Sequence, residues 1–259
     1  MKAIILAAGK GVRMGRYTET LPKGMLPFRG KPLLEHQINI LRESGIDEIN
    51  IVTGYHKEAI TFDHIKYYHN PDFAVTNMLE SLMCAREAFD ADLLISYADL
   101  VYTRDLVTQL IQENGPIAVA VDSAWRQYWT RRFGSAEEDL ETLTIENHQI
   151  IELGKEVTSS GGIDYRYIGI MKFSKDVWPV VYDLYQHKQE KNEAWKQSGK
   201  DFRNGYMTDL LNELIQEGVP IVPSITEKQW LEFDTAADYE MNITNLENGT
   251  LSEYFEGKL

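Results

Sequence analysis

A run of small residues with two basic side chains near the start of the chain has the make-up of a phosphate-binding loop. It directly follows a short apolar run, and its small residues are Ala7, Ala8, Gly9 and Gly11. Residues of this size let backbone N–H groups come close to a polyphosphate, and Arg13 and Lys23 supply positive charge. The segment therefore predicts a triphosphate site.

The spacing of the glycines argues against two other nucleotide-binding loops. A dinucleotide fingerprint needs glycine or alanine at position 14, where this chain has Met14. The second predicted strand also ends in Thr53-Gly54-Tyr55 instead of the acidic residue of a dehydrogenase. A P-loop requires Gly-Lys-Ser/Thr at a fixed spacing, which does not follow here.

Among the other residues that could take part in chemistry, one aspartate lies where a ligand is expected to bind. Asp99 follows a predicted strand, and open parallel sheets bind their ligands beyond the carboxyl ends of the strands. The six histidines have no spacing typical of metal ligands. The single cysteine, Cys84, excludes an intramolecular disulfide, and its helical surroundings predict a buried structural thiol instead of a nucleophile.

The net charge of the chain limits the classes of partner that the protein can bind. The 259 residues carry a formal charge of −14, which argues against a general nucleic-acid binder, since that function needs a basic face. The longest apolar runs are shorter than the roughly 18 residues that a membrane span requires, and the apolar start is too short for a signal peptide. We expect a cytoplasmic protein that binds neither a membrane nor nucleic acid. The net charge does not exclude a homo-oligomer.

Alternating apolar and amphipathic stretches indicate the elements that position these residues. Strands are predicted at 2–7, 48–53, 92–97 and 117–121, with helices at 32–44, 77–89 and 104–113 between them. This alternation predicts an α/β fold with a doubly wound, mostly parallel sheet that helices cover on both faces.

The second half of the chain has a different pattern. Strand-like runs at 143–145 and 167–173 indicate antiparallel additions at one side of the sheet, and 206–218 is an amphipathic helix. The charged segment 188–200, with Trp195, is predicted to be an exposed helix or a mobile excursion. We expect a single domain over 1–259, with 1–122 mainly binding nucleotide and 123–240 mainly binding an acceptor.

The opening string resembles the nucleotidyltransferase family of the sugar-phosphate and phosphocholine type. That family has Leu-Ala-Ala-Gly-x-Gly-x-Arg and, about ten residues later, Pro-Lys; the matching residues are Leu6, Ala7, Ala8, Gly9, Gly11, Arg13, Pro22 and Lys23. The resemblance runs to about residue 240 and implies a Rossmann-like nucleotidyltransferase fold with an added antiparallel acceptor-binding part.

The same resemblance implies the catalytic groups. Asp99 and Asp234 would hold Mg²⁺, an ion that prefers oxygen ligands, while Lys23 would serve the α-phosphate and Arg13 the leaving pyrophosphate. Ala98 replaces the family's usual glycine before the first aspartate, a change that matters only if the backbone needs a positive φ there.

Other matching segments imply contacts with the two substrates. Asn77 and Ser81 lie in a segment that contacts the base and ribose, although Asn77 could equally be a helix N-cap with Glu80 completing a capping box. Lys155 matches a lysine that reaches the phosphate of the acceptor or product. The stretches 122–132 and 206–211 are similar to the phosphocholine branch. Their aromatic residues either hold an ammonium group or, as with Trp125 and Trp129, form a buried helix face.

These features together predict a Mg²⁺-dependent cytidylyltransferase. It would transfer CMP from CTP to a small phosphorylated or phosphonate acceptor, of phosphocholine or 2-aminoethylphosphonate type, and release pyrophosphate. Two alternatives stay open at this point: a sugar-1-phosphate nucleotidyltransferase using UTP, dTTP or GTP, and a non-catalytic module that senses a nucleotide.

Overall fold

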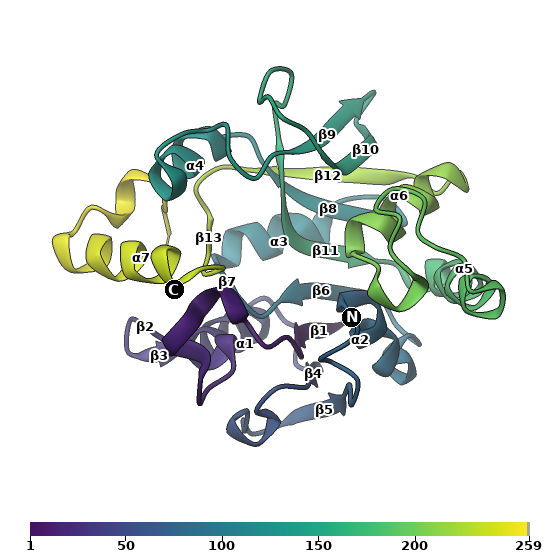
Figure 1. The fold of residues 1–259 in the computed structure, drawn as a ribbon, viewed down its shortest axis with the longest axis horizontal. Helices are drawn as coiled ribbons and strands as arrows, with labels where there is room; N and C mark the ends of the chain where they lie inside the picture. The colour runs from purple at the N-terminus through teal and green to yellow at the C-terminus, as the bar shows by residue number, and fades with distance from the viewer. Residues whose placement is uncertain (258–259) are drawn as a thin grey trace.

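The computed structural model describes residues 1–257 and is organised around one seven-stranded sheet (Figure 1). All neighbouring strands in it run parallel except β11, which is antiparallel to both of its neighbours. In spatial order the strands are β12 (Ile221–Thr226), β8 (Ile117–Asp122), β11 (Arg166–Phe173), β6 (Leu93–Tyr97), β1 (Lys2–Ala7), β4 (Ile49–Thr53) and β5 (Ile65–His69).

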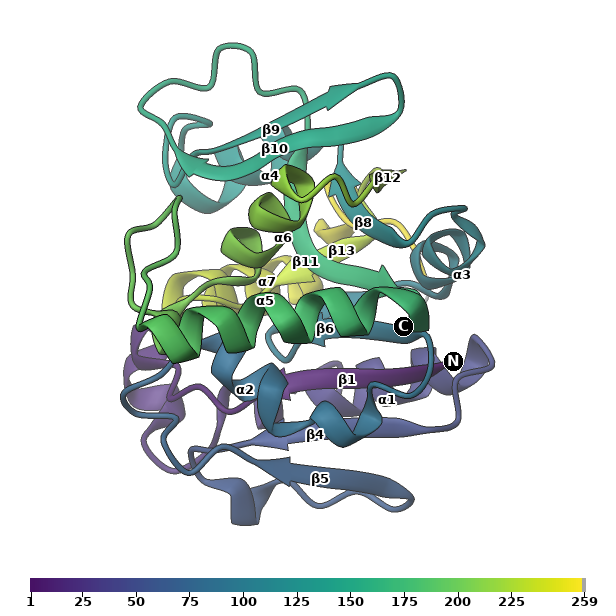
Figure 2. The same ribbon diagram turned by 90° about the vertical axis from the view of Figure 1, so that its right-hand side faces the viewer.

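Helices cover both faces of this sheet, because apolar side chains of β1 alternate between two clusters. Ile5 belongs to one buried cluster, and Ile4 and Leu6 belong to the other. Figure 2 shows α2, α5 and α6 in front of the strands. The helices are α1 (Leu33–Glu43), α2 (Met78–Cys84), α3 (Arg104–Gln112), α4 (Trp125–Phe133), α5 (Trp178–Lys191), α6 (Met207–Gln216) and α7 (Ala236–Asn248). The predicted doubly wound α/β fold is confirmed.

The antiparallel strands are placed differently from the prediction. The hairpin of β9 (Glu141–Glu146) and β10 (Gln149–Glu156) is a separate two-stranded sheet at the top of Figures 1 and 2. β11 instead lies inside the main sheet, where Ile170 pairs with Ser96 and Met171 with Val119. Both faces of β11 are buried, so its position at one side of the sheet was wrongly predicted.

Segment 188–200 is mainly exposed, but it contains two buried side chains that its charge did not suggest. It begins in the last turn of α5, and Lys188 and Trp195 are 1% and 0% exposed. The Lys188 Nζ atom lies 2.8 Å from Glu213 Oε1 and 4.7 Å from the centre of the Trp195 ring. Most residues of the segment are exposed, as predicted, and Lys188 and Trp195 are the exceptions, because a distant acidic partner allows the lysine to be buried.

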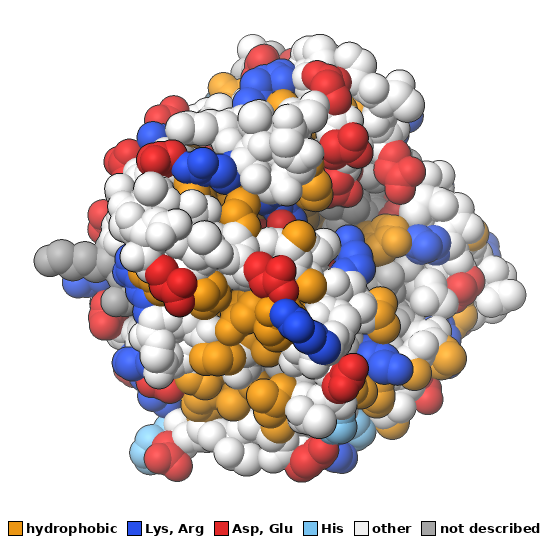
Figure 3. All heavy atoms as spheres, turned by 60° about the vertical axis from the view of Figure 1, so that its left-hand side comes forward, with side chains coloured by type: hydrophobic (Ala, Val, Ile, Leu, Met, Phe, Trp, Pro, Cys, Tyr) orange, Lys and Arg blue, Asp and Glu red, His pale blue; other side chains and the backbone are white. Residues whose placement is uncertain are grey.

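On the face that Figure 3 shows, the surface charges are mixed, and the single cysteine of the chain is only partly buried. On the face in Figure 3, the basic side chains of the described residues are scattered among acidic ones and form no continuous basic surface. No helix within residues 1–257 is long and apolar enough to cross a membrane. Cys84 is a free, partly buried thiol, and burial raises its pKa. The division of labour between residues 1–122 and 123–240 stays a prediction.

Candidate active site

The loop after β1 requires glycine at its tightest point. Gly11 has a φ of 63°, and a Cβ atom there would lie 3.3 Å from Thr18 Cγ2 and 3.4 Å from Lys23 Cβ. The Thr18 hydroxyl donates a hydrogen bond of 2.9 Å to the Gly11 carbonyl. Across the loop, the Tyr55 N–H donates to the Ala8 carbonyl at 3.0 Å. These contacts hold the loop at the carboxyl end of β1.

A short strand pair brings the two predicted metal ligands together. Asp99 lies two residues beyond the end of β6, and the next strand, β7 (Leu100–Tyr102), pairs antiparallel with β13 (Trp230–Glu232). The pairing continues by one bond, in which the Phe233 N–H donates to the Asp99 carbonyl at 2.9 Å. Asp234 therefore lies beside Asp99. Ala98 has no positive φ, so the replaced glycine causes no backbone strain.

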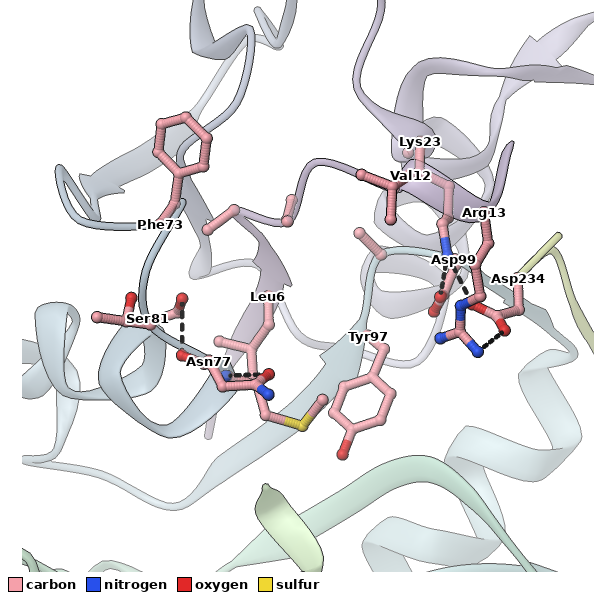
Figure 4. A pocket seen from close by; sticks show the side chains of 18 residues that line it. Leu6, Val12, Arg13, Lys23, Phe73, Asn77, Ser81, Tyr97, Asp99 and Asp234 are labelled. Atoms are coloured by element: carbon pink, nitrogen blue, oxygen red, sulfur yellow. Dashed lines mark hydrogen bonds and ion pairs between the residues drawn. The ribbon is translucent and has the colours of Figure 1, made fainter. Parts of the chain in front are cut away.

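Lys23 lies between these two carboxylates. Its Nζ atom is 3.0 Å from Asp99 Oδ2 and 3.0 Å from Asp234 Oδ1, so the two oxygens cannot be more than twice that distance apart. Arg13 Nη1 lies 2.7 Å from Asp234 Oδ2. Figure 4 shows the four side chains together at one side of a pocket. Two cations and two anions thus form a charge-balanced cluster.

Burial and the neighbouring charges have opposite effects on the pKa of Lys23. Burial lowers the pKa of Lys23, but the charges of Asp99 and Asp234 raise the pKa by more, so that it lies above 10.5. The lysine is therefore a cation at neutral pH. Its side chain is only 14% exposed, whereas that of Arg13 is 68% exposed.

The cluster forms one wall of a cavity of about 280 Å³. Phe73, Asn77 and Ser81 lie on the opposite side, as Figure 4 shows. The cavity brings together nearly all predicted nucleotide and catalytic residues, namely Leu6, Ala7, Ala8, Gly9, Gly11, Arg13, Lys23, Asn77, Ser81, Asp99 and Asp234. Its charged end and its less charged end match the phosphates and the nucleoside of a nucleotide.

Asn77 fits both roles that the sequence left open. Its Oδ1 accepts a hydrogen bond from the Met78 N–H at 2.9 Å as the N-cap of α2, and the residue also lines the cavity. The capping box with Glu80 does not form; the Glu80 carboxylate instead accepts a hydrogen bond from the Tyr185 hydroxyl. Glu80 thereby ties α2 to α5, which explains why the local pattern was misleading.

A second, larger cavity of about 680 Å³ adjoins the first. Arg13, Met78, Tyr97 and Asp234 line both, so the charged cluster lies at their junction. Lys155, the predicted acceptor ligand, lines only the second cavity. The wall of this cavity carries side chains of both charge signs and several aromatic rings; they include Trp129, Glu141, Arg166, Lys200, Tyr206 and Glu232.

The aromatic residues of α4 have separate roles. Trp125 and Trp129 are 0% and 1% exposed and pack edge to face with ring centres 5.9 Å apart, so the buried helix face is confirmed. Trp129 nevertheless lines the second cavity, whereas Trp125 does not. The Trp129 ring is covered by the guanidinium groups of Arg132 and Arg166, whose carbons lie 4.7 Å and 4.5 Å from its centre, so it supports the cavity wall.

Several cavity residues were not predicted from the sequence. Tyr97 lines both cavities and donates or accepts a 2.8 Å hydrogen bond with the Tyr167 hydroxyl. Its place at the end of β6, two residues before Asp99, could have suggested it. Phe73 and Arg166 had no such signal, because one lies in an irregular loop and the other begins a strand far along the chain.

The donor set at the cluster suits a hard divalent cation. Asp99 Oδ1 is buried and has no hydrogen-bond partner among the described residues, which leaves one carboxylate oxygen free. Nowhere within residues 1–257 do three or more His, Cys, Asp or Glu residues gather as a metal cage. Two carboxylates suffice for Mg²⁺ when substrate phosphates and waters complete its shell.

Comparison with known proteins places this chain among nucleotide-transferring enzymes. Residues 3–192 match the MobA-like NTP transferase domain. The CTP:phosphoglutamine cytidylyltransferase of Campylobacter jejuni is 34% identical over 254 residues, which cover 94% of this chain and 99% of the relative. The 2-aminoethylphosphonate cytidylyltransferase of Lancefieldella rimae is 26% identical over 243 residues, with coverage of 91% and 89%.

A solved structure supports the fold. The CTP:phosphocholine cytidylyltransferase of Streptococcus pneumoniae matches with a TM-score of 0.72 and 22% identity, over 95% of this chain and 98% of the other. The predicted nucleotidyltransferase family and Rossmann-like fold are confirmed. The chain belongs to the MobA-like NTP transferase family and is a nucleotidyltransferase.

Proposed function

We propose that this enzyme transfers CMP from CTP to a small phosphorylated or phosphonate acceptor and releases pyrophosphate, with Mg²⁺ as its metal ion. The observation that carries the proposal is the junction of the two cavities, where Arg13 and Asp234 line both. One cavity has the charged cluster at one side and Phe73, Asn77 and Ser81 at the other, as a nucleotide requires, and the other has side chains of both charge signs, as a small charged molecule requires. The three cytidylyltransferases that resemble the chain support CTP and this class of acceptor.

The reaction is an in-line displacement at the α-phosphorus. An oxygen of the acceptor phosphate or phosphonate forms a new bond to that phosphorus, and the bond to the bridging oxygen of the β-phosphate breaks. The electron pair leaves with pyrophosphate. The acceptor oxygen is already ionised at neutral pH, so no general base is needed. Catalysis then consists of holding two anions together and stabilising the charge that develops.

The side chains of the cluster divide this work. Lys23, buried between two carboxylates, offers its ammonium group to the α-phosphate. Arg13 is largely exposed and can reach the leaving pyrophosphate. Asp99 and Asp234 would hold the divalent cation, which supplies Lewis-acid stabilisation and orientation when bound. Lys155, on the wall of the second cavity, would contact the phosphate of the acceptor or product.

Asn77 and Ser81 would bind the nucleoside end of the substrate. Asn77 is held as an N-cap, and Ser81 Oγ accepts a hydrogen bond from Asn70 at 3.0 Å, so both have fixed positions. The small residues of the opening loop, Leu6, Ala7, Ala8, Gly9 and Gly11, would present their backbone to the triphosphate.

Pyrophosphate release tests the proposal. CTP, UTP, GTP, ATP and dTTP are crossed with phosphocholine, 2-aminoethylphosphonate, phosphoglutamine and glucose-1-phosphate, with Mg²⁺ and with chelator. We expect release with CTP and an amine-bearing acceptor, and release at least about 100-fold slower with Asp99→Asn. Release only with a sugar-1-phosphate would replace the proposal by the sugar-1-phosphate alternative. Nucleotide binding without any release would favour the sensor.

A further inference from the structure

Arg166 is a buried cation with unused binding capacity in the wall of the second cavity. Its side chain is 7% exposed, and its Nη2 atom donates to Asp139 Oδ2 at 3.1 Å. The guanidinium carbon lies 4.5 Å from the centre of the Trp129 ring, which fixes its plane. Its Nη1 atom is buried and has no hydrogen-bond partner among the described residues.

An unpaired buried donor is costly, and more so on a charged group. The nearest charges explain why the protein itself does not satisfy it. Asp139 already pairs with Nη2, and its side chain is 59% exposed. Glu141 lines the same cavity, and within residues 1–257 its carboxylate forms no hydrogen bond or ion pair. Arg166, whose Nη1 is buried and unpaired, and Glu141 therefore line the same cavity, and burial raises the pKa of Glu141 while the charge of Arg166 lowers it.

The loop that carries Asp139 is held in place beside Arg166. Asp139 has a φ of 48°, a left-handed conformation that aspartate adopts more readily than most other residues. The Trp129 indole N–H donates to the Glu138 carbonyl at 3.0 Å and holds the same loop. The loop therefore keeps the Asp139 carboxylate paired with Arg166 Nη2.

We propose that Arg166 binds a carboxylate of the acceptor through Nη1 and that Glu141 binds its ammonium group, so that the acceptor is a phosphorylated α-amino acid. This inference rests on the proposed function and specifies its acceptor. Phosphocholine and 2-aminoethylphosphonate have no carboxylate and would leave Nη1 unpaired. Guanidinium forms strong charge-assisted hydrogen bonds with both carboxylate and phosphate. Because the proposed function assigns the acceptor phosphate to the charged cluster and Lys155, the carboxylate is the anionic group that remains for Nη1.

Acceptors that differ only in the carboxylate test the proposal. O-phosphoserine and phosphoethanolamine form one such pair, and phosphoglutamine and its decarboxylated analogue form another. For the wild-type enzyme with CTP and Mg²⁺, we expect kcat/KM to be roughly 10- to 100-fold higher for the carboxylate-bearing member of the better-used pair. Equal values for both members, or a preference for the decarboxylated member, would overturn the role of Arg166.

Variants of Arg166 test whether this side chain causes the preference for carboxylate-bearing acceptors. Arg166→Met should remove the preference by lowering kcat/KM for the carboxylate-bearing member alone, and Arg166→Lys should retain part of it. Arg131→Met is the matched control, because Arg131 lies on α4, is 37% exposed in its side chain and pairs with Glu253 outside both cavities. An equal loss for both acceptors in Arg166→Met would indicate a structural role and contradict the proposal.

Calorimetry separates this inference from the proposed function. If no acceptor supports pyrophosphate release, the proposed transfer reaction fails, but binding of O-phosphoserine and phosphoethanolamine can still be compared. Tighter binding of O-phosphoserine to the wild type and not to Arg166→Met would support the carboxylate site. If release occurs while neither kcat/KM nor binding depends on the carboxylate, the transfer reaction stands and the carboxylate site is refuted.

Discussion

Replacing Lys23 by methionine removes the cation at the centre of the charged cluster and is the sharpest test of the site. The ammonium group lies 3.0 Å from one oxygen of Asp99 and 3.0 Å from one oxygen of Asp234. Loss of one charge-stabilising contact to a transition state costs about 3 kcal/mol, so turnover should fall about 100-fold or more. The rate of pyrophosphate release at saturating CTP and acceptor measures this directly.

The same change also affects stability. Breaking a fully buried ion pair costs about 3–5 kcal/mol. Here the carboxylates of Asp99 and Asp234 are 19% and 12% exposed and Arg13 still contacts Asp234, so we expect a smaller loss, about 1–3 kcal/mol. The pKa of Lys23 is raised above 10.5 in the folded state. Its contribution is therefore complete at neutral pH and is lost as pH rises through that folded value.

Urea unfolding and a matched lysine separate the two effects. Lys31→Met removes a lysine that is 48% exposed and pairs with Glu35 one helical turn away, so it should change neither quantity measurably. The rate of pyrophosphate release by Lys23→Met can be interpreted only if the variant unfolds cooperatively in urea, which shows that it is folded. If that folded variant released pyrophosphate within about threefold of the wild-type rate, its loss would be far below that of a charge-stabilising contact and the assigned role would be wrong.

Three further changes test other parts of the structure. Asp99→Asn should lower turnover about 100-fold or more while leaving the urea midpoint nearly unchanged, since only its link to the lysine and the cation is weakened; normal turnover would remove it from the site. Asn77→Ala should lower the unfolding free energy by about 1 kcal/mol through loss of the N-cap, and it should raise KM for CTP. An unchanged KM would show that Asn77 acts only as a helix cap. Burial raises the pKa of Asp122 from 3.8 to about 6, so the folded protein favours its protonated form. Wild type should therefore lose roughly 3 kcal/mol relative to Asp122→Asn as pH rises from about 4 to above 6, and a pH-independent difference would contradict this.

Local patterns were enough to predict the strands that carry the nucleotide cavity. The runs at β1, β4, β6 and β8 are short, apolar and separated by amphipathic helices, so each is recognisable without its neighbours. The opening loop was recognisable for the same reason, since its chemistry is contained within consecutive residues. These parts depend on interactions close in sequence.

The parts that local sequence patterns could not predict depend on distant partners. Asp234 reaches Asp99 through two three-residue strands, which are too short to show a periodic pattern, so only the family resemblance indicated the pair. Lys188 was expected at the surface because its burial depends on Glu213. Arg166 is a single basic residue at a strand start, and its importance follows only from the cavity around it.

The two cations of the cluster differ in how readily they can leave it, and this difference explains how an acidic protein handles a polyphosphate. Arg13 is held by one carboxylate and its side chain is 68% exposed, so its ion pair is worth only about 0–1 kcal/mol. Lys23 is held by two carboxylates and is 14% exposed, so moving it is more costly. A triphosphate can therefore draw Arg13 away from Asp234 at little cost while Lys23 keeps its place. Under the proposed function, this movement of Arg13 would leave an Asp234 oxygen free, and that oxygen and Asp99 Oδ1 are the ones that would hold a divalent cation.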